Sequence, residues 1–164
     1  MIKKVTFLLS VAITLAFGSL NAQTLNPPDL INLVNKNVKD VNTENKILFI
    51  NVWKSSDFDS RQNTKEFNKI AKIYEYGKLS HGIQGVCFIN ISLDNNLTDW
   101  SIAIKKDSVQ TKHNLENTSG SYSEILNYFE NKPGSILISS NGQLLKRNLT
   151  KENCFDTFKS YITR

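Results

Sequence analysis

Residues 47–61 read ILFINVWKSSDFDSR, and this stretch decides the fold. It opens with a nearly continuous apolar run, residues 47–53, rich in β-branched and aromatic side chains. Such a short run is typical of a central strand covered on both faces of a sheet. Residues 54–59 are polar apart from Phe58, and beyond them Phe67, Ile70, Ala71 and Tyr74 recur at the spacing of one helix side. The stretch therefore predicts a buried strand, a polar turn and an amphipathic helix.

Similar patterns extend outward from this stretch. Residues 86–91, VCFINI, predict a second buried strand, and Asn141-Gly142 predicts a hairpin between strands at 135–139 and 144–146. Strands that alternate with helices and end in a hairpin indicate an α/β fold, with a central mixed sheet of about four strands flanked by helices on both faces. The spacing of apolar residues also predicts a helix at 29–41, and Gly77 is expected as the C-cap of the helix after the turn. A short helix is expected to be capped by Thr98, with Trp100, Ala103 and Ile104 on one side, and another to open with a capping box of Ser121 and Glu124. A last helix is expected from Thr150, where it buries Cys154 or Phe155, Phe158 and Ile162.

The N-terminus reads as a secretory signal peptide. The basic pair Lys3-Lys4 precedes an apolar segment, residues 5–17, that is too short to span a bilayer, and small residues follow up to Ala22. A membrane anchor that stays in place is the alternative reading. We expect a signal peptide over residues 1–22, a linker with Pro27-Pro28 and a helix over residues 23–43, and one domain over residues 44–164. The mature protein is expected in the periplasm, with secretion as the alternative, and without stable membrane insertion.

Charge and cysteine content narrow the class further. The 164 residues carry 20 Lys and Arg against 15 Asp and Glu, a net charge of +5. The basic residues are spread along the chain, so no nucleic-acid partner is predicted. The two cysteines, Cys87 and Cys154, share no motif and lie in apolar segments. We expect both to be free, buried thiols rather than a disulfide, although an oxidising compartment would permit one.

Residues 47–61 also resemble the strand and active-site turn of the periplasmic TlpA/ResA-type thioredoxin-like proteins. In that family the strand ends in W-x-S/T-x-C-x-x-C-R. Trp53, Ser55 and Arg61 match this pattern, whereas Asp57 and Ser60 stand at the two cysteine positions. The likeness covers about residues 44–163 and implies a thioredoxin-like fold. Three other segments support the likeness. NISLD at 90–94 resembles a strand end of the family, and WSIAIKKD at 100–107 resembles a helix of the family. Lys132-Pro133 and residues 135–142 resemble the family's cis-proline and the hairpin that follows it.

The departures from the family pattern remove its chemistry. The family's nucleophilic thiolate is stabilised by a helix N-terminus, where Asp57 keeps a negative charge but cannot attack a disulfide. Ser60 cannot resolve a mixed disulfide, and Asn63 replaces the acidic residue that usually follows the motif. We therefore predict a redox-inactive turn, Asp57-Phe58-Asp59-Ser60, with no catalytic residue and no cofactor.

Four hypotheses concern the altered turn. Asp57, or Ser56 beside it, is a good residue to cap the following helix. Phe58 is expected to be exposed at the tip, and the alternative is that it folds back onto the core. The resemblance places Lys132 beside the turn, where it would form an ion pair with Asp57 or Asp59. A metal site at these two aspartates is weakly supported, because hard cations take six or more oxygen ligands.

His81 and His113 are expected on the surface.

The function expected from this pattern is a non-catalytic, chaperone-like module that binds an exported protein or peptide. The family's groove beside the proline uses main-chain groups, so binding does not need the cysteines. The alternatives are an envelope thiol–disulfide oxidoreductase that acts through an unconventional monothiol, or a structural partner in an envelope complex. Asp107-Ser108-Val109 resembles a short O-glycosylation signal of Bacteroidetes.

Overall fold

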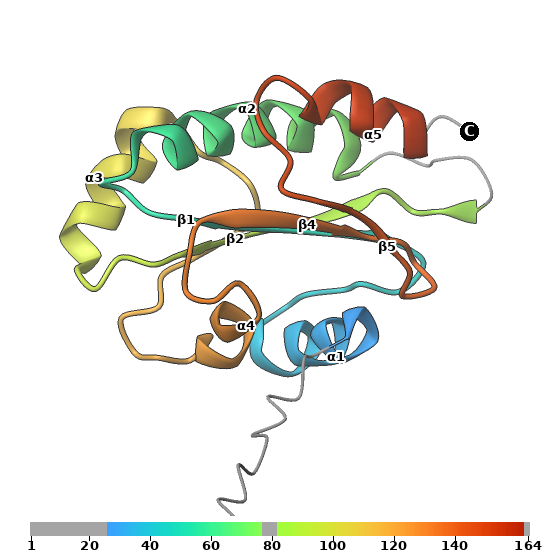
Figure 1. Ribbon diagram of the computed structural model, residues 1–164, viewed down its shortest axis with the longest axis horizontal. Helices are drawn as coiled ribbons and strands as arrows, with labels where there is room; N and C mark the ends of the chain where they lie inside the picture. The colour runs from blue at the N-terminus through green and yellow to red at the C-terminus, as the bar shows by residue number, and fades with distance from the viewer. Residues whose placement is uncertain (1–25, 77–81, 163–164) are drawn as a thin grey trace, which may run out of the picture.

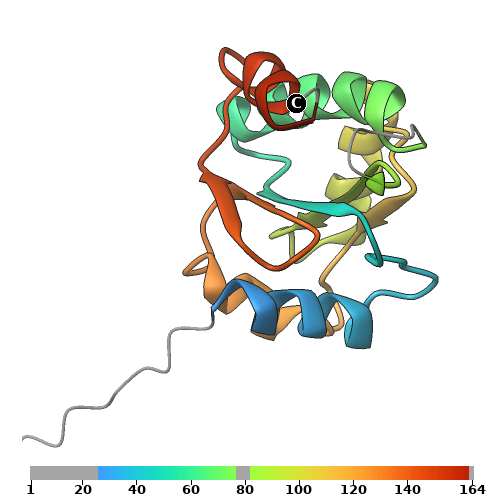
Figure 2. The ribbon, with the colours of Figure 1, turned by 90° about the vertical axis from the view of Figure 1, so that its right-hand side faces the viewer.

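A five-stranded mixed sheet lies between two layers of helices (Figure 1). The computed structural model describes residues 26–76 and 82–162. The strands are β1 (Ile47–Trp53), β2 (Val86–Ser92), β3 (His113–Leu115), β4 (Gly134–Ile138) and β5 (Leu144–Arg147), in the order β3-β2-β1-β4-β5. The helices α1 (Pro27–Asn37) and α4 (Ser123–Tyr128) cover one face, and α2 (Phe58–Tyr74), α3 (Leu97–Asp107) and α5 (Cys154–Ile162) cover the other, as Figure 2 also shows.

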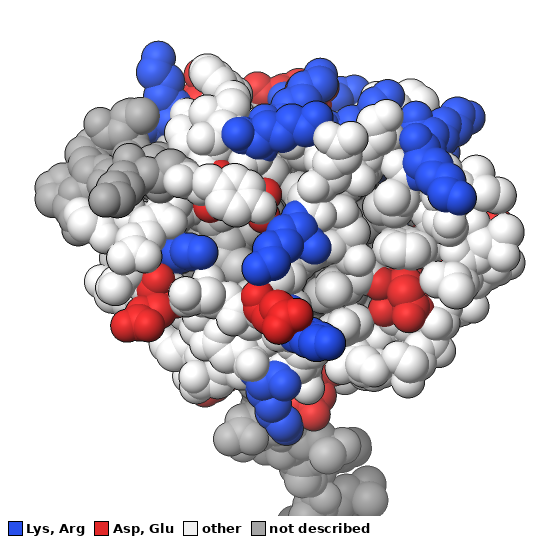
Figure 3. Space-filling view, turned by 180° about the vertical axis from the view of Figure 1, so that it is seen from behind, with Lys and Arg blue, Asp and Glu red and all other residues white. Residues whose placement is uncertain are grey.

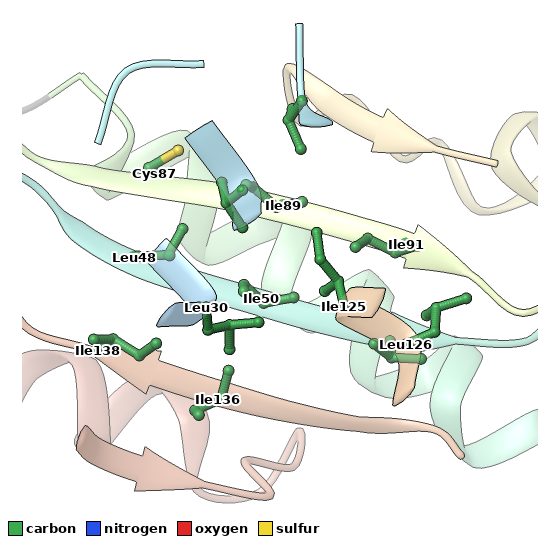
Figure 4. Packing of buried hydrophobic residues seen from close by; sticks show 13 residues of the cluster. Leu30, Leu48, Ile50, Cys87, Ile89, Ile91, Ile125, Leu126, Ile136 and Ile138 are labelled. Atoms are coloured by element: carbon green, nitrogen blue, oxygen red, sulfur yellow. The ribbon is translucent and has the colours of Figure 1, made fainter. Parts of the chain in front are cut away.

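The central strand β1 matches its predicted bounds, and all seven of its residues are buried. It pairs parallel with β2 and antiparallel with β4. On the face covered by α2 and α5, the ring of Phe49 packs edge-on against Phe67 and Phe158, at centroid distances of 4.9 and 5.3 Å. On the other face, Leu30 of α1 and Ile125 of α4 pack over the aliphatic residues of β1, β2 and β4 (Figure 4). The packing on both faces confirms the predicted α/β fold, a central mixed sheet flanked by helices on each side.

The sheet has five strands where about four were expected. The additional strand, β3, pairs parallel with β2 at the edge of the sheet. No strand was predicted at these three residues. His113, expected on the surface, is 7% exposed and begins this strand. Burial, followed by the nearby charge of Lys112, lowers the pKa of His113.

Two helix starts differ from the prediction because asparagine caps lie upstream of them. Asn26 and Asp29 form a capping box, so Pro27 and Pro28 are the first residues of α1 and not a linker, and α1 ends at Asn37. Proline tolerates this position since its missing N–H would be unpaired anyway. Asn96 caps α3 by accepting a hydrogen bond from the Thr98 N–H, so Thr98 is not the cap.

The last two helices also start later than expected. The capping box of Ser121 and Glu124 does not form, because α4 begins at Ser123 without a side-chain cap. In α5, which begins at Cys154, that cysteine is buried and Phe155 is exposed. The hairpin at Asn141-Gly142 is confirmed, with Gly142 at a φ of +85°.

Some expectations fall outside the described residues, namely the signal peptide, His81, the C-cap at Gly77 and the side chain of Ile162. The helix α2 ends at Tyr74, with Glu75 as its C-cap.

None of the helices within the described ranges is long and apolar enough to cross a membrane. On the face in Figure 3, basic and acidic side chains lie side by side.

Candidate functional site

The degenerate turn joins β1 to α2, and Asp57 is the N-cap of that helix. Its Oδ1 accepts a hydrogen bond from the Ser60 N–H at 2.7 Å, which confirms the predicted cap and assigns it to Asp57 rather than Ser56. Phe58, the first helical residue, is 72% exposed, so it does not fold back onto the core. The carboxylate thus occupies one of the N-terminal N–H groups that an incoming anion would otherwise bind.

Ser60 serves the structure of the turn. Its side chain is buried at 6% exposure, and its Oγ accepts a hydrogen bond from the Lys54 N–H at 3.2 Å. The hydroxyl lies 3.2 Å from the carbonyl oxygens of Lys54 and Asp57, to which it can donate its proton. The position of the second cysteine is therefore occupied by a hydroxyl that ties the two sides of the turn together.

A buried carboxylate holds the first half of the turn. Asp94, 5% exposed, accepts hydrogen bonds from the Ser55 N–H at 3.1 Å and the Ser55 Oγ at 2.8 Å. The Ser92 hydroxyl donates a further bond at 2.6 Å. Sequence reasoning quoted Asp94 only as the end of the NISLD segment, and it did not predict the contact with Ser55.

Arg61 is joined to α3 by a bidentate ion pair. Its Nε and Nη2 donate to the Asp107 carboxylate at 2.8 and 2.9 Å. This hydrogen bonding raises the pKa of Arg61, while burial acts in the opposite direction. Arg61 ends the segment 47–61 and Asp107 ends the segment 100–107, and both segments resemble the family pattern. These two positions were the available signal for the pairing, which sequence reasoning missed. The pair fixes α2 against α3 beside the turn.

Two expectations for the residues around Pro133 are wrong. Lys132 forms its ion pair with Glu130, at 2.9 Å, and not with Asp57 or Asp59. That bond lowers the pKa of Glu130. No cis peptide bond occurs among the described residues, so Pro133 is not a cis-proline. The chain turns instead through Glu130 and Asn131, whose left-handed φ values are 54° and 53°.

A pocket of about 250 Å³ lies between the turn and Pro133. One side is formed by Asn51, by the N-cap Asp57 and by α2 residues that include Asp59, and the other by residues 133–134 and 148–150. We call it the acidic pocket. A second hollow of about 320 Å³, lined by Lys54 and Leu93 among others, borders Pro133 from its other side. The turn and the proline therefore still frame a concave surface.

A ladder of polar side chains crosses the sheet beneath the turn. Asn51 Nδ2 donates to Thr64 Oγ1 at 2.9 Å and to Asn90 Oδ1 at 3.0 Å. Asn90 Nδ2 continues to Thr111 Oγ1 and Asn114 Oδ1, at 2.6 and 2.9 Å. Trp53, which ends β1, is 1% exposed, and its buried Nε1 has no partner among the described residues. The signal for the ladder was an asparagine within each of two apolar strands.

The two thiols lie elsewhere in the fold and are buried, as predicted. Cys87 is within β2 and Cys154 begins α5, and both are free. Burial raises the pKa of Cys87 to about 11 and also raises the pKa of Cys154. A neutral, buried thiol is a poor nucleophile, because the thiolate is the reactive form.

We therefore expect both thiols to resist labelling by a water-soluble disulfide reagent at pH 8. Cys87 should react at least about a hundredfold more slowly in the native protein than in urea, because its thiolate fraction falls by that factor or more. Mass spectrometry of a quenched time course with Cys154→Ser measures this rate. Rapid native labelling of Cys87 would contradict the assignment of an inert thiol.

Among the comparisons with known proteins, solved structures identify the fold. No family model matches the chain. No curated protein matches it either. Solved structures do match. The thioredoxin domain of a thiol-disulfide oxidoreductase from Bacteroides vulgatus has a TM-score of 0.60 and 17% identity, over 74% of this chain and 82% of the other.

Two other matches come from the same genus. A thiol-disulfide oxidoreductase from Bacteroides fragilis has a TM-score of 0.57 and 24% identity, over 73% of this chain and 83% of the other. The C-terminal domain of a proposed thiol-disulfide oxidoreductase from Bacteroides thetaiotaomicron has a TM-score of 0.57 and 28% identity, over 71% and 77%. The chain therefore has a thioredoxin-like fold and is similar to thiol–disulfide oxidoreductases.

Proposed function

We propose that this protein is an exported, redox-inactive thioredoxin-like module that binds an extended segment of another exported protein beside Pro133. The observation that carries the proposal is the state of the turn. Asp57 and Ser60 are both engaged in internal hydrogen bonds, so the turn is complete without thiols. Its surroundings nevertheless remain hollow on both sides of the proline. Export follows from the predicted signal peptide over residues 1–22, ahead of the domain.

Redox inactivity is supported by the positions of the remaining thiols. A monothiol mechanism needs an exposed cysteine of lowered pKa. Cys87 and Cys154 have the opposite properties, since both are buried and burial raises both pKa values. Neither cysteine is among the residues that line the hollows beside the turn. These properties favour a binding role over the oxidoreductase alternative.

Binding is supported by the shape and chemistry of the surface. An extended peptide is held by its main chain while pockets receive alternate side chains. Here Pro133 stands between two hollows, and Phe58 offers an apolar contact at the tip of the turn. Burial of this exposed phenylalanine by a partner would stabilise the complex, by about 25 cal/mol for each Å² of apolar surface removed from water.

The test uses a permanently unfolded protein, reduced and carboxymethylated α-lactalbumin with a fluorescent label. We expect saturable binding by fluorescence anisotropy, weakened about five- to tenfold by Phe58→Ala through lost apolar burial. The matched control is Ile73→Ala. Ile73 is 57% exposed on the same helix, about 22 Å from Phe58 along the axis.

Two outcomes would count against the proposal. Equal weakening by the Phe58 and Ile73 variants would show that binding does not centre on the turn. Insulin reduction by the wild type that is lost in Cys87→Ser or Cys154→Ser would support the monothiol oxidoreductase instead.

A further inference from the structure

The acidic pocket carries two negative charges without a basic counterpart. Asp57 and Asp59 both line it, and none of its lining residues is lysine, arginine or histidine. Among the cations near the turn, Arg61 pairs with Asp107, Lys132 pairs with Glu130, and Lys54 lines the second hollow rather than this pocket. The N-terminus of α2 offsets only about half a unit of charge. The pocket is therefore suited to a cation and unsuited to an anion.

A buried side chain that lines the same pocket, Asn51, has an amide oxygen without a donor among the described residues. Asn51 is 3% exposed and lines the pocket. Its Nδ2 donates to Thr64 and Asn90, and the single proton of the Thr64 hydroxyl goes to the Ser60 carbonyl oxygen. Thr64 must then accept from Asn51, which fixes the orientation of the amide. The Asn51 Oδ1 accepts no hydrogen bond from any of the described residues.

The fully buried polar side-chain atoms without a partner among the described residues are Trp53 Nε1 and Trp100 Nε1, so the Asn51 oxygen is open to the pocket, where water or a ligand with N–H groups can donate to it. Buried polar atoms in folded proteins nearly always have a hydrogen-bond partner, whether protein or water. Ammonium and guanidinium groups carry several donors and no acceptor, so they suit a pocket of carboxylate and amide oxygens. This open acceptor is independent of the two aspartates and is compatible with the same ligand chemistry.

The remaining wall and the size indicate a side chain rather than a whole small molecule. Phe67, Pro133 and Leu149 give part of the lining an apolar character. Lysine and arginine bury an apolar stem while their charged ends stay with polar groups. At about 250 Å³ the pocket is smaller than the roughly 300–1,000 Å³ of pockets that enclose complete ligands.

We infer that the acidic pocket receives a basic side chain, the ammonium of lysine or the guanidinium of arginine. This inference rests on the proposed function, because that side chain belongs to the bound segment. A divalent metal is the less suitable occupant, because no group of three or more histidine, cysteine, aspartate or glutamate side chains occurs among the described residues. Hard cations take six or more oxygen ligands.

The experiment compares three acetylated and amidated peptides of alanine and serine that differ only at a central residue, which is lysine, arginine or uncharged norleucine. Titration calorimetry at low salt should show the lysine or arginine peptide binding about tenfold more tightly than the norleucine peptide. Affinity should fall as salt rises. The comparison between lysine and arginine identifies the preferred cation.

The variant is Asp57→Asn/Asp59→Asn, which removes the charge and keeps the cap, because asparagine caps helices as well as aspartate. It should abolish the preference over norleucine. The matched control is Glu44→Gln/Glu124→Gln, which changes the net charge equally at two exposed residues outside the pocket and should leave the preference intact.

An independent probe of the pocket is n-butylammonium chloride, followed through the backbone amide resonances of Asn51, Asp57 and Ser60. Equal binding of all three peptides would overturn the inference and leave the proposed function standing. Binding of butylammonium without peptide binding would support the cation pocket and reject the proposed function. Absence of both, or displacement of butylammonium by equimolar calcium chloride, would overturn the inference.

Discussion

The double variant Asp57→Cys/Ser60→Cys is expected to reduce insulin at a rate at least about tenfold above that of the wild type. The fold already provides the geometry for a reactive pair. Residue 57 is exposed at the N-cap of α2, and residue 60 is buried one turn later. The 2.7 Å contact between Asp57 Oδ1 and the Ser60 backbone nitrogen shows that the first side chain lies against the second residue.

The expected rate follows from the electrostatics of the helix. A thiol with a pKa of about 8.5 is only a few per cent ionised at pH 7, whereas one lowered to about 7 at a helix N-terminus is about half ionised. Loss of the aspartate cap should cost about 1 kcal/mol of stability. Thermal unfolding beside the insulin assay separates this cost from the gain of activity.

The single variants serve as controls for the double variant. Asp57→Cys alone should form mixed disulfides that accumulate, because no second thiol releases them, and Ser60→Cys alone should stay unreactive because it is buried. A double variant that forms no internal disulfide under mild oxidation would contradict the view that the turn keeps the geometry of a redox site.

Arg61→Ala is expected to destabilise the protein by about 2–4 kcal/mol in urea unfolding. The Asp107 side chain is 7% exposed and would be left as a buried charge without its partner. Removal of one member of a fully buried pair costs roughly 3–5 kcal/mol. The 23% exposure of the Arg61 side chain lowers this expectation somewhat.

Arg61→Lys should rescue only part of this loss, since an ammonium cannot reproduce the bidentate geometry. The matched control is Lys69→Ala, which removes an exposed ion pair with Glu66 on the same helix and should cost less than about 0.5 kcal/mol. Equal losses for the Arg61 and Lys69 variants would show that the pair with Asp107 contributes nothing beyond helix propensity.

Sequence reasoning was most successful where local signals were long or chemically specific. The apolar runs of β1 and β2 exceed what chance or a loop would supply, so both strands were found with bounds correct to within one residue. The cap at Asp57 followed from the carboxylate preference of helix N-termini, and the exposure of Phe58 from its place beside that cap.

The missed strand depends on tertiary contacts, whereas the missed caps at Asn26 and Asn96 are local signals. The strand β3 has three residues, His-Asn-Leu, and no alternation can be read from so short a segment. Its place in the sheet depends on Asn114 and Thr111 bonding to Asn90 across the strands. The partner of Lys132 depended on a left-handed turn at Glu130 and Asn131 that the sequence alone does not reveal.

The polar ladder beneath the turn has a consequence for how the sheet assembles. Two strands as uniformly apolar as β1 and β2 could associate in several shifted alignments of similar hydrophobic energy. Only the native alignment sets Asn51 opposite Asn90 and Asn90 opposite Asn114. A shifted pairing would leave these amides without partners in an apolar layer, at roughly 1–3 kcal/mol for each group. The asparagines thus penalise misaligned folding intermediates, a selectivity that a wholly aliphatic sheet centre would lack.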